Sequence, residues 1–198
     1  MSDLFDEADD ATLLEPDERT GLLPSWVTYR AELNEVEQDN ILKGAAWAKD
    51  RRGKSVTNIL SVVFVQTLHK HLFGEVWAWA GQYRRTERNI GIAAYRIPQE
   101  ISAALDDVTY WMEHGTYKND EIAVRLHHRF VAIHPFPNGN GRHARLMADL
   151  LIEQMGGSAF SWGRRSIQKI GDLRAQYVSA LQAADAHDIA QLLAFARL

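Results

Sequence analysis

Residues 134–145 read HPFPNGNGRHAR, and this stretch decides how the central helices of the chain are joined. Pro135 is expected to end the helix before it, because proline has no N–H with which to continue a helix. The run NGNG at 138–141 favours a tight turn, since glycine tolerates backbone angles that other residues avoid. A new helix is predicted over residues 142–154, and a pair of glycines follows it. The stretch is therefore a sharp turn between two helices.

The start of the helix after this turn is suited to bind phosphate. Its free N–H groups and the positive end of its dipole attract anions. Arg142 and Arg145 lie three residues apart on one side of the helix, so both can reach the same anion. His134 stands just before the turn, and its imidazole is a candidate general base because it takes up a proton near neutral pH. Together these groups predict phosphoryl or nucleotidyl transfer, and no Gly-Lys-Ser/Thr follows that would indicate a P-loop.

The rest of the chain is predicted to be mostly α-helical. Residues 83–97, with Gly91 in the turn, favour a short β-hairpin instead. The expected fold class is a helical domain with one hairpin and an N-terminal helical extension, which disfavours a parallel-sheet nucleotide fold. Helical spacing or helix-start signals mark the ranges 25–49, 57–72, 99–113, 119–134, 166–183 and 188–197.

The length of 198 residues fits one domain with a short arm. We expect an acidic flexible arm at 1–20, an N-terminal helical extension at 21–41 and the helical domain at 42–198. A net charge of −4 argues against binding to nucleic acid, and the lack of cysteine excludes disulfides and thiolate metal sites. The N-terminus is unlike a signal peptide, and no apolar run reaches the roughly 20 residues that span a bilayer. A cytoplasmic protein without membrane contact is therefore expected.

Residues 134–145 resemble the signature of the Fic (Fic/Doc) family, His-Pro-Phe-x-Asp/Glu-Gly-Asn-Gly-Arg-x-x-Arg. Every fixed position matches except the acidic one, which is Asn138 in this chain. The resemblance spans roughly residues 42–193, so that the domain at 42–198 corresponds to a Fic domain. With the tract 21–41, the order of features is also similar to the Fic proteins called mobile mystery protein B. That narrower resemblance implies a small helix-turn-helix partner protein encoded alongside, as in toxin–antitoxin pairs.

The resemblance implies a protein adenylyltransferase (AMPylator), which transfers AMP from ATP to a Ser, Thr or Tyr hydroxyl of a target protein. In that scheme His134 is the catalytic base, and Arg142 and Arg145 hold the inner phosphates and the γ-phosphate. Backbone and amide donors of the turn hold the phosphates as well. The residues implied to bind the nucleotide phosphates are Gly139, Asn140, Gly141, Arg142 and Arg145.

Position 138 departs from the family signature at the residue implied to bind Mg²⁺, or Mn²⁺ in its place. The amide oxygen of Asn138 can ligate a metal but lacks the charge of a carboxylate. We therefore expect weaker metal affinity, or a metal held mainly by the nucleotide. Two alternative functions stay open: a regulatory Fic domain that binds nucleotide without turnover, and Fic-type transfer of another phosphate-containing group.

Two further elements are implied by the resemblance. The stretch Thr28–Glu32 partly matches the inhibitory motif Ser/Thr-x-x-x-Glu-Gly/Asn, which predicts that Glu32 pairs with Arg145 and restrains activity; a solvated helix face is the alternative. The hairpin is implied to be a flap that docks the target by strand addition, with its tip at Ile90, Gly91 and Ile92; an incidental surface ribbon is the alternative. The sequence leaves open whether the protein forms a homodimer.

Overall fold

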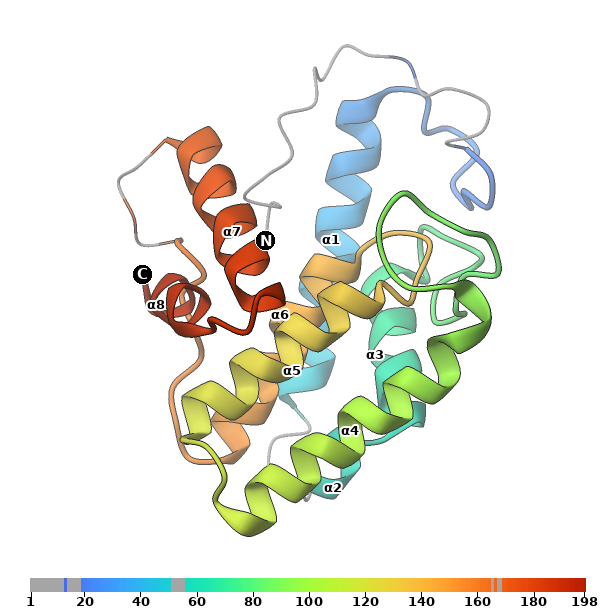
Figure 1. Ribbon diagram of the computed structural model, residues 1–198. Helices are drawn as coiled ribbons and strands as arrows, with labels where there is room; N and C mark the ends of the chain where they lie inside the picture. The colour runs from blue at the N-terminus through green and yellow to red at the C-terminus, as the bar shows by residue number, and fades with distance from the viewer. Residues whose placement is uncertain (1–12, 14–18, 51–55, 165, 167–168) are drawn as a thin grey trace.

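The computed structural model describes residues 13, 19–50, 56–164, 166 and 169–198, which fold into a mostly helical molecule as expected (Figure 1). The acidic arm expected at 1–20 lies almost wholly outside the described residues. In chain order the elements are α1 (Arg30–Lys49), α2 (Val56–Ile59), α3 (Val62–Phe73), the 3₁₀ helix η1 (Ala94–Arg96), α4 (Ile97–His114), α5 (Asn119–Ile133), α6 (Asn140–Gln154), α7 (Ile170–Asp185) and α8 (Ala190–Arg197).

Helices α5 and α6 form the centre of the molecule and pack against each other (Figure 1). Helix α4 covers α5 on one side and α8 covers it on another, while α3 lies against α1 and α6. Much of α6 is buried, including Leu146, Met147, Leu150 and Leu151, because it has neighbours on several sides. Among the described residues, no helix is both long and apolar enough to cross a bilayer.

The ends of the central helices follow local rules of the sequence. Pro98 lies in the first turn of α4, where its missing N–H costs no helical hydrogen bond. Asp120 and Glu121 lie in the first turn of α5, where their charge complements the helix dipole. Helix α1 runs without a break past residues 41 and 42, so the N-terminal extension and the helical domain share one helix.

Gly139 explains why α6 begins two residues earlier than expected. This glycine has φ +76°, a left-handed conformation, and acts as the N-cap of the helix. A Cβ atom at this position would lie 2.4 Å from Cζ of Phe73 on α3. Only glycine satisfies both the backbone angle and the close approach of α3, so the turn is fixed by the packing of a neighbouring helix.

The β-hairpin expected within residues 83–97 does not form, and the structure has no strand in this stretch. Residues 83–93, called the 83–93 loop below, precede η1 and form no backbone–backbone hydrogen bond with one another. The backbone N–H of Arg84 instead donates to Pro135 O over 2.9 Å, and that of Ile92 donates to Ile133 O over 3.4 Å. The backbone groups that would have joined two strands therefore bind the end of α5 and the turn after it.

Asp149 on α6 ties the chain that follows the helix back to the core. Its Oδ1 accepts from the indole N–H of the buried Trp162 over 2.9 Å and from the backbone N–H of Phe160 over 3.0 Å. Burial raises the pKa of this carboxyl to about 6 despite these two donors. One buried carboxylate thus holds the segment between α6 and α7 in place.

Replacing Asp149 by alanine should therefore cost stability. We expect Asp149→Ala to lower the free energy of unfolding by about 2–3 kcal/mol, because two buried N–H groups lose their acceptor. The exposed Asp106 on α4 provides the control, and Asp106→Ala should change the value by less than about 0.5 kcal/mol. Urea denaturation at pH 7.5 measures both. Equal losses in the two variants would contradict the anchoring role.

Candidate active site

His134 lies at the C-terminal end of α5, where the chain turns into the loop that leads to α6. It has φ +54° and ψ +61°, a left-handed conformation that is uncommon for a residue with a side chain. Its backbone N–H still donates to Phe130 O over 3.0 Å, so the residue closes the helix. The side chain is half-buried and its Nδ1 is shielded from solvent. This conformation ends α5, and residues 135–139 then lead to the start of α6.

Arg84, in the 83–93 loop, binds the backbone of this turn, a role that no local sequence signal marks. The side chain is buried, with 3% of its surface exposed. Its Nε donates to His134 O over 2.7 Å, and its Nη1 donates to Thr86 O over 3.0 Å. Its Nη2 donates to Ile92 O and, over 3.4 Å, to Ile133 O. One guanidinium group therefore joins the 83–93 loop to the backbone of the candidate base.

The charge around His134 favours its neutral form. Burial lowers the pKa of His134 to about 4, and the positive charges of Arg84 and Arg88 act in the same direction. A backbone contact with Val131 works against this shift. At neutral pH the imidazole is therefore unprotonated and able to accept a proton, although the lowered pKa also makes it a weaker base.

The loop between α5 and α6 is held by the side chain of Asn140. Its Oδ1 accepts from the backbone N–H of Phe136 over 2.9 Å, and its Nδ2 donates to Phe136 O over 2.9 Å. The ring of Phe136 is fully buried and stacks on His69 with centroids 3.7 Å apart. We expected the amide of Asn140 to bind phosphate, but it is engaged in shaping the loop. Its backbone N–H remains the group that can serve an anion.

His69 on α3 fixes the other side of the same loop. Its Nδ1 accepts from the backbone N–H of Gly81 over 3.0 Å, so its Nε2 carries the proton and donates to Asn138 O over 3.0 Å. Burial lowers the pKa of His69 well below its ordinary value, which keeps the ring neutral. Sequence reasoning gives no signal for this contact, since the two partners are 69 residues apart.

The described contacts of Glu32 lie within its own helix end, and the predicted inhibitory pair with Arg145 stays a prediction. Oε2 of Glu32 accepts from the backbone N–H groups of Thr28 and Tyr29 over 2.7 and 3.0 Å. Glu32 is the third residue of α1 and therefore caps the free N–H groups at the start of its own helix. A short motif in the sequence cannot distinguish a capping glutamate from one that faces another helix.

A different glutamate on α1, Glu37, contacts one of the signature arginines, Arg142. It is buried, with 4% of its surface exposed. One carboxylate oxygen accepts from Nη1 of Arg142 over 2.8 Å, and the other accepts from the indole N–H of Trp77 over 2.6 Å. Glu37 lies five positions after Glu32, which is more than one helical turn further along α1. The negative charge beside the phosphate-binding segment therefore comes from Glu37.

The two signature arginines have different neighbours. Arg142 reaches α1 through Glu37, and its guanidinium also lies 4.9 Å from the ring centre of Phe73. The guanidinium of Arg145 lies 5.9 Å from the ring centre of Tyr177 on α7. We expected both arginines on one side of α6. In the structure they flank its N-terminal turns, with Arg142 facing α1 and Arg145 facing α7.

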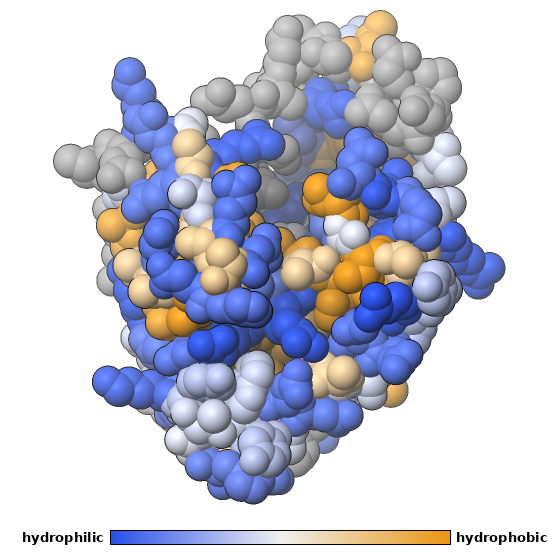
Figure 2. Space-filling model, in the orientation of Figure 1, coloured by the Kyte–Doolittle hydropathy of each residue, from blue (hydrophilic) through white to orange (hydrophobic). Residues whose placement is uncertain are grey.

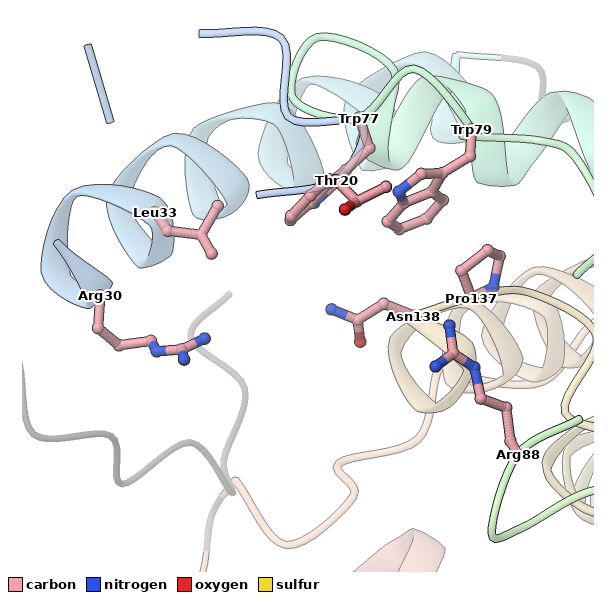
Figure 3. Close-up of a pocket in the computed structure, with 8 residues that line it drawn as sticks. All are labelled: Thr20, Arg30, Leu33, Trp77, Trp79, Arg88, Pro137 and Asn138. Atoms are coloured by element: carbon pink, nitrogen blue, oxygen red, sulfur yellow. The ribbon is translucent and has the colours of Figure 1, made fainter. Parts of the chain in front are cut away.

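A cavity of about 420 Å³ opens beside the loop (Figure 3). Asn138 projects into it, and the guanidinium of Arg88 from the 83–93 loop is turned toward Pro137 and Asn138. Arg30 from α1 reaches into the cavity on the side opposite Arg88. The described residues that line it are Thr20, Arg30, Leu33, Trp77, Trp79, Arg88, Pro137 and Asn138.

These residues do not fit a divalent cation held by the protein. Oδ1 of Asn138 accepts from the N–H of Gly139 over 2.7 Å, so one of the two lone pairs of the candidate ligand is engaged. Among the described residues that line the cavity there are two arginines and no carboxylate. In the part of the chain that the structure describes, no group of three or more His, Cys, Asp or Glu side chains is placed to hold a metal. We therefore assign no catalytic step to Mg²⁺ or Mn²⁺.

The expected flap tip lies directly against the candidate base. Gly91 has φ +92°, and a Cβ atom there would lie 2.6 Å from Cβ of His134. Ile90 beside it is 61% exposed, whereas Ile92 is half-buried. Figure 2 shows apolar residues among hydrophilic ones on the face of the molecule that carries this loop. The 83–93 loop thus borders the site, although it does so without strand pairing.

Comparison with known proteins identifies the fold of the chain and the family of its central domain. Residues 59–152 match the sequence model of the Fic/DOC family. They include α3 to α5, most of α6 and the loop that carries His134. The chain therefore contains a Fic/DOC family domain.

Individual relatives match part of the chain. Protein adenylyltransferase fic-1 of Caenorhabditis elegans is 30% identical over 101 residues, which are 49% of this chain and 20% of that protein. The uridine 5'-monophosphate transferase of Xanthomonas campestris pv. campestris is 31% identical over 70 residues, or 31% of this chain and 13% of that protein. The chain thus spans about a fifth or less of the length of these curated relatives.

Solved structures extend the similarity over nearly the whole chain. The N-terminal Fic domain of a VirB-translocated Bep effector protein from Bartonella quintana, with bound ADP, has a TM-score of 0.67 at 14% identity. The match covers 96% of this chain and 91% of that chain. At this identity the similarity establishes the fold alone. The narrower resemblance to mobile mystery protein B stays a prediction.

The environment of His134 should be visible in its titration. Nitrogen-edited NMR of the imidazole rings should give a pKa of about 4 for His134, assigned by comparison with His134→Ala. Arg88→Gln should raise this pKa, because removing a nearby positive charge favours the protonated ring. Arg85→Gln, a neighbouring exposed arginine, should raise it less. An ordinary pKa near 6.5 in the wild type would show that the ring is solvated rather than held in place.

Proposed function

We propose that this protein is a Fic-type adenylyltransferase that moves AMP from ATP to a Ser, Thr or Tyr hydroxyl of another protein. One observation carries the proposal: a neutral, half-buried His134 ends α5, and the short loop after it leads directly to the N-terminus of α6, where free backbone N–H groups attract phosphate. The relatives named protein adenylyltransferase, of which fic-1 is one, support the choice of nucleotide.

The proposed reaction uses the chain's own groups at each step. The Nδ1 of His134 is buried, which leaves Nε2 to take the proton of the target hydroxyl. The hydroxyl oxygen then attacks the α-phosphorus, the bond to the β-phosphate breaks, and pyrophosphate leaves. Backbone N–H groups at Gly139, Asn140 and Gly141 face the charge that develops on the phosphate oxygens. Arg142 and Arg145 draw the remaining phosphates toward the same helix end.

Two alternatives keep specific support. The relative named uridine 5'-monophosphate transferase keeps transfer of a different nucleotide open. A nucleotide-binding domain without turnover is supported by the contact between Glu37 and Arg142 and by the neutral Asn138. The target protein, a helix-turn-helix partner, a homodimer and a cytoplasmic location stay predictions from the sequence.

Labelled nucleotides separate these functions. After incubation with a cell lysate, we expect label from α-labelled ATP on protein and none from γ-labelled ATP. His134→Ala should reduce the label by at least about 100-fold, because the general base is lost. His128→Ala on the same helix is the control and should retain most of the label, since His128 contacts Asp185 away from the turn. Label from the γ position indicates a kinase, and stronger label from UTP indicates a uridylyltransferase.

The proposal includes a restraint by Glu37 in place of the predicted Glu32. The carboxylate of Glu37 holds Arg142 and places negative charge next to the segment that would receive phosphate. An incoming nucleotide must therefore either separate this pair or accept a nearby like charge. The buried hydrogen bond to Trp77 keeps Glu37 in this position.

Removing the charge of Glu37 should release the restraint. Glu37→Gln, which preserves the shape of the side chain, is expected to raise ATP affinity and α-label transfer by about three- to tenfold. Glu32→Gln is the matched control on the same helix and should leave both values within about twofold, because it alters only a helix cap. A gain in Glu32→Gln without one in Glu37→Gln would restore the motif-based hypothesis. Calorimetry and the labelling assay measure the two values.

A further inference from the structure

The buried guanidinium group of Arg84 has a set of partners that a structural ion pair would not explain. Among the described residues, every hydrogen-bond acceptor of this side chain is a backbone carbonyl oxygen: those of Thr86, Ile92, Ile133 and His134. These contacts engage four of the five N–H groups of the side chain. The positive charge is therefore satisfied by hydrogen bonds and is not neutralised by a carboxylate.

Two of the four carbonyls belong to the end of α5. Ile133 is the last residue of the helix and His134 is its C-cap. The last carbonyl groups of a helix have no partner within it and carry the negative end of its dipole, so a guanidinium group is a suitable cap. The left-handed conformation of His134 is costly for a residue with a side chain and persists only where surrounding contacts enforce it. Arg84 supplies such contacts from a segment 50 residues earlier in the chain.

The other two carbonyls, those of Thr86 and Ile92, belong to the 83–93 loop itself. Gly91 shows how closely this loop packs on the base: a Cβ atom there would lie 2.6 Å from Cβ of His134 and 2.9 Å from Nη2 of Arg84. The backbone N–H of Arg84 also donates to the carbonyl of Pro135, the residue after the base, over 2.9 Å. The loop, the guanidinium group and the turn at His134 therefore form one packed unit.

The charge of Arg84 also acts on the imidazole ring. Burial is the main cause that lowers the pKa of His134 to about 4, and the charge of Arg84 adds to it, followed by that of Arg88. Both arginines belong to the 83–93 loop. A segment that holds the backbone of the base thus also helps to keep its ring in the neutral form, which is the form that accepts a proton.

We propose that Arg84 is a positioning residue for the transfer reaction: it fixes the turn that carries His134 and ties the orientation of the imidazole to the 83–93 loop. The inference rests on the proposed function, because it requires that the ring of His134 take a proton from the target hydroxyl. Since the side chain of Arg84 is buried, it acts through the backbone of His134 and not by contact with a substrate.

Labelling rates and ATP affinity of Arg84 variants test the proposal. Arg84→Met should lower the rate of transfer from saturating α-labelled ATP by about 30- to 100-fold, because the base is misplaced. Its dissociation constant for ATP, measured by calorimetry, should stay within about threefold, since the phosphate-binding groups of α6 are unchanged. Arg84→Lys keeps the charge but loses the fork, and its rate should fall between the two. The exposed Arg85 on the same loop is the control, and Arg85→Met should keep the rate within about twofold.

The titration of His134 is the readout that a purely structural role would not move. In nitrogen-edited NMR, Arg84→Met should raise the pKa of His134 toward the ordinary value near 6.5, because a positive charge and the fixed turn are both lost. Arg84→Lys should raise this pKa less, since the charge remains. Arg85→Met should also raise it less than Arg84→Met does.

Gly91→Ala tests the same unit with Arg84 in place, and with Arg84→Lys it carries the test if Arg84→Met does not fold. The new methyl group would push the loop away from His134, so the labelling rate should fall at least about tenfold with ATP affinity unchanged. Gly115→Ala is the matched control, because Gly115 also has a positive φ, of +58°, but a Cβ atom there would meet nothing within 4 Å. Its rate should stay within about twofold of wild type. Circular dichroism checks that each variant keeps its helices.

The outcomes separate this inference from the proposed function. An unchanged labelling rate and an unchanged pKa of His134 in folded Arg84→Met overturn the positioning role, while His134-dependent labelling leaves the adenylyltransferase proposal standing. Equal losses of ATP affinity and labelling rate in Arg84→Met also overturn it, because Arg84 would then act on nucleotide binding. Absence of label in the wild type overturns the proposed function and the catalytic consequence of the turn, whereas the pKa of His134 in the variants still decides whether Arg84 holds the ring.

Discussion

The paired hydrogen bonds between the Asn140 side chain and the backbone of Phe136 are the constraint on which the site depends. They close the loop between α5 and α6 from inside, so the first residue of α6 holds the residues that precede the helix. The buried Phe136 ring then fastens the loop to His69 on α3. Because buried polar groups are costly to leave unpaired, this arrangement resists opening. His134 and the N-terminus of α6 are consequently presented at a fixed separation without any ligand.

Charge is distributed unevenly around this rigid loop. The protein is acidic overall, yet arginines from three elements, Arg30, Arg88 and Arg142, gather beside residues 134–142. Of these, Arg88 also lowers the pKa of His134, and positive charge of this kind attracts phosphate. Glu37 is a buried exception, and its contact with Arg142 offsets part of that charge. Glu37 and an incoming polyphosphate thus compete electrostatically for the guanidinium group of Arg142.

The 83–93 loop shows how a local pattern is overridden by longer-range contacts. Its sequence has the glycine and flanking residues of a hairpin, but the carbonyl of Ile92 binds the guanidinium of Arg84, and the backbone N–H groups of Arg84 and Ile92 bind the α5–α6 connection. Gly91 does not form a hairpin turn. It is required because a side chain at this position would collide with His134. The loop therefore contributes to the site by contact with the base rather than by strand geometry.

The helices and the core of the candidate site could be predicted from the sequence, because helix starts, glycine turns and the 134–145 signature depend on residues close together in the chain. The order and approximate ends of α4, α5, α6 and α8 followed from such local signals. The roles of Glu32, Glu37 and Arg84 could not be predicted, since they depend on which face of α1 meets α6 and on contacts between residues up to 105 apart in the chain. Tertiary packing decided those contacts, because a charged side chain pairs with whatever group the fold places within about 3 Å of it.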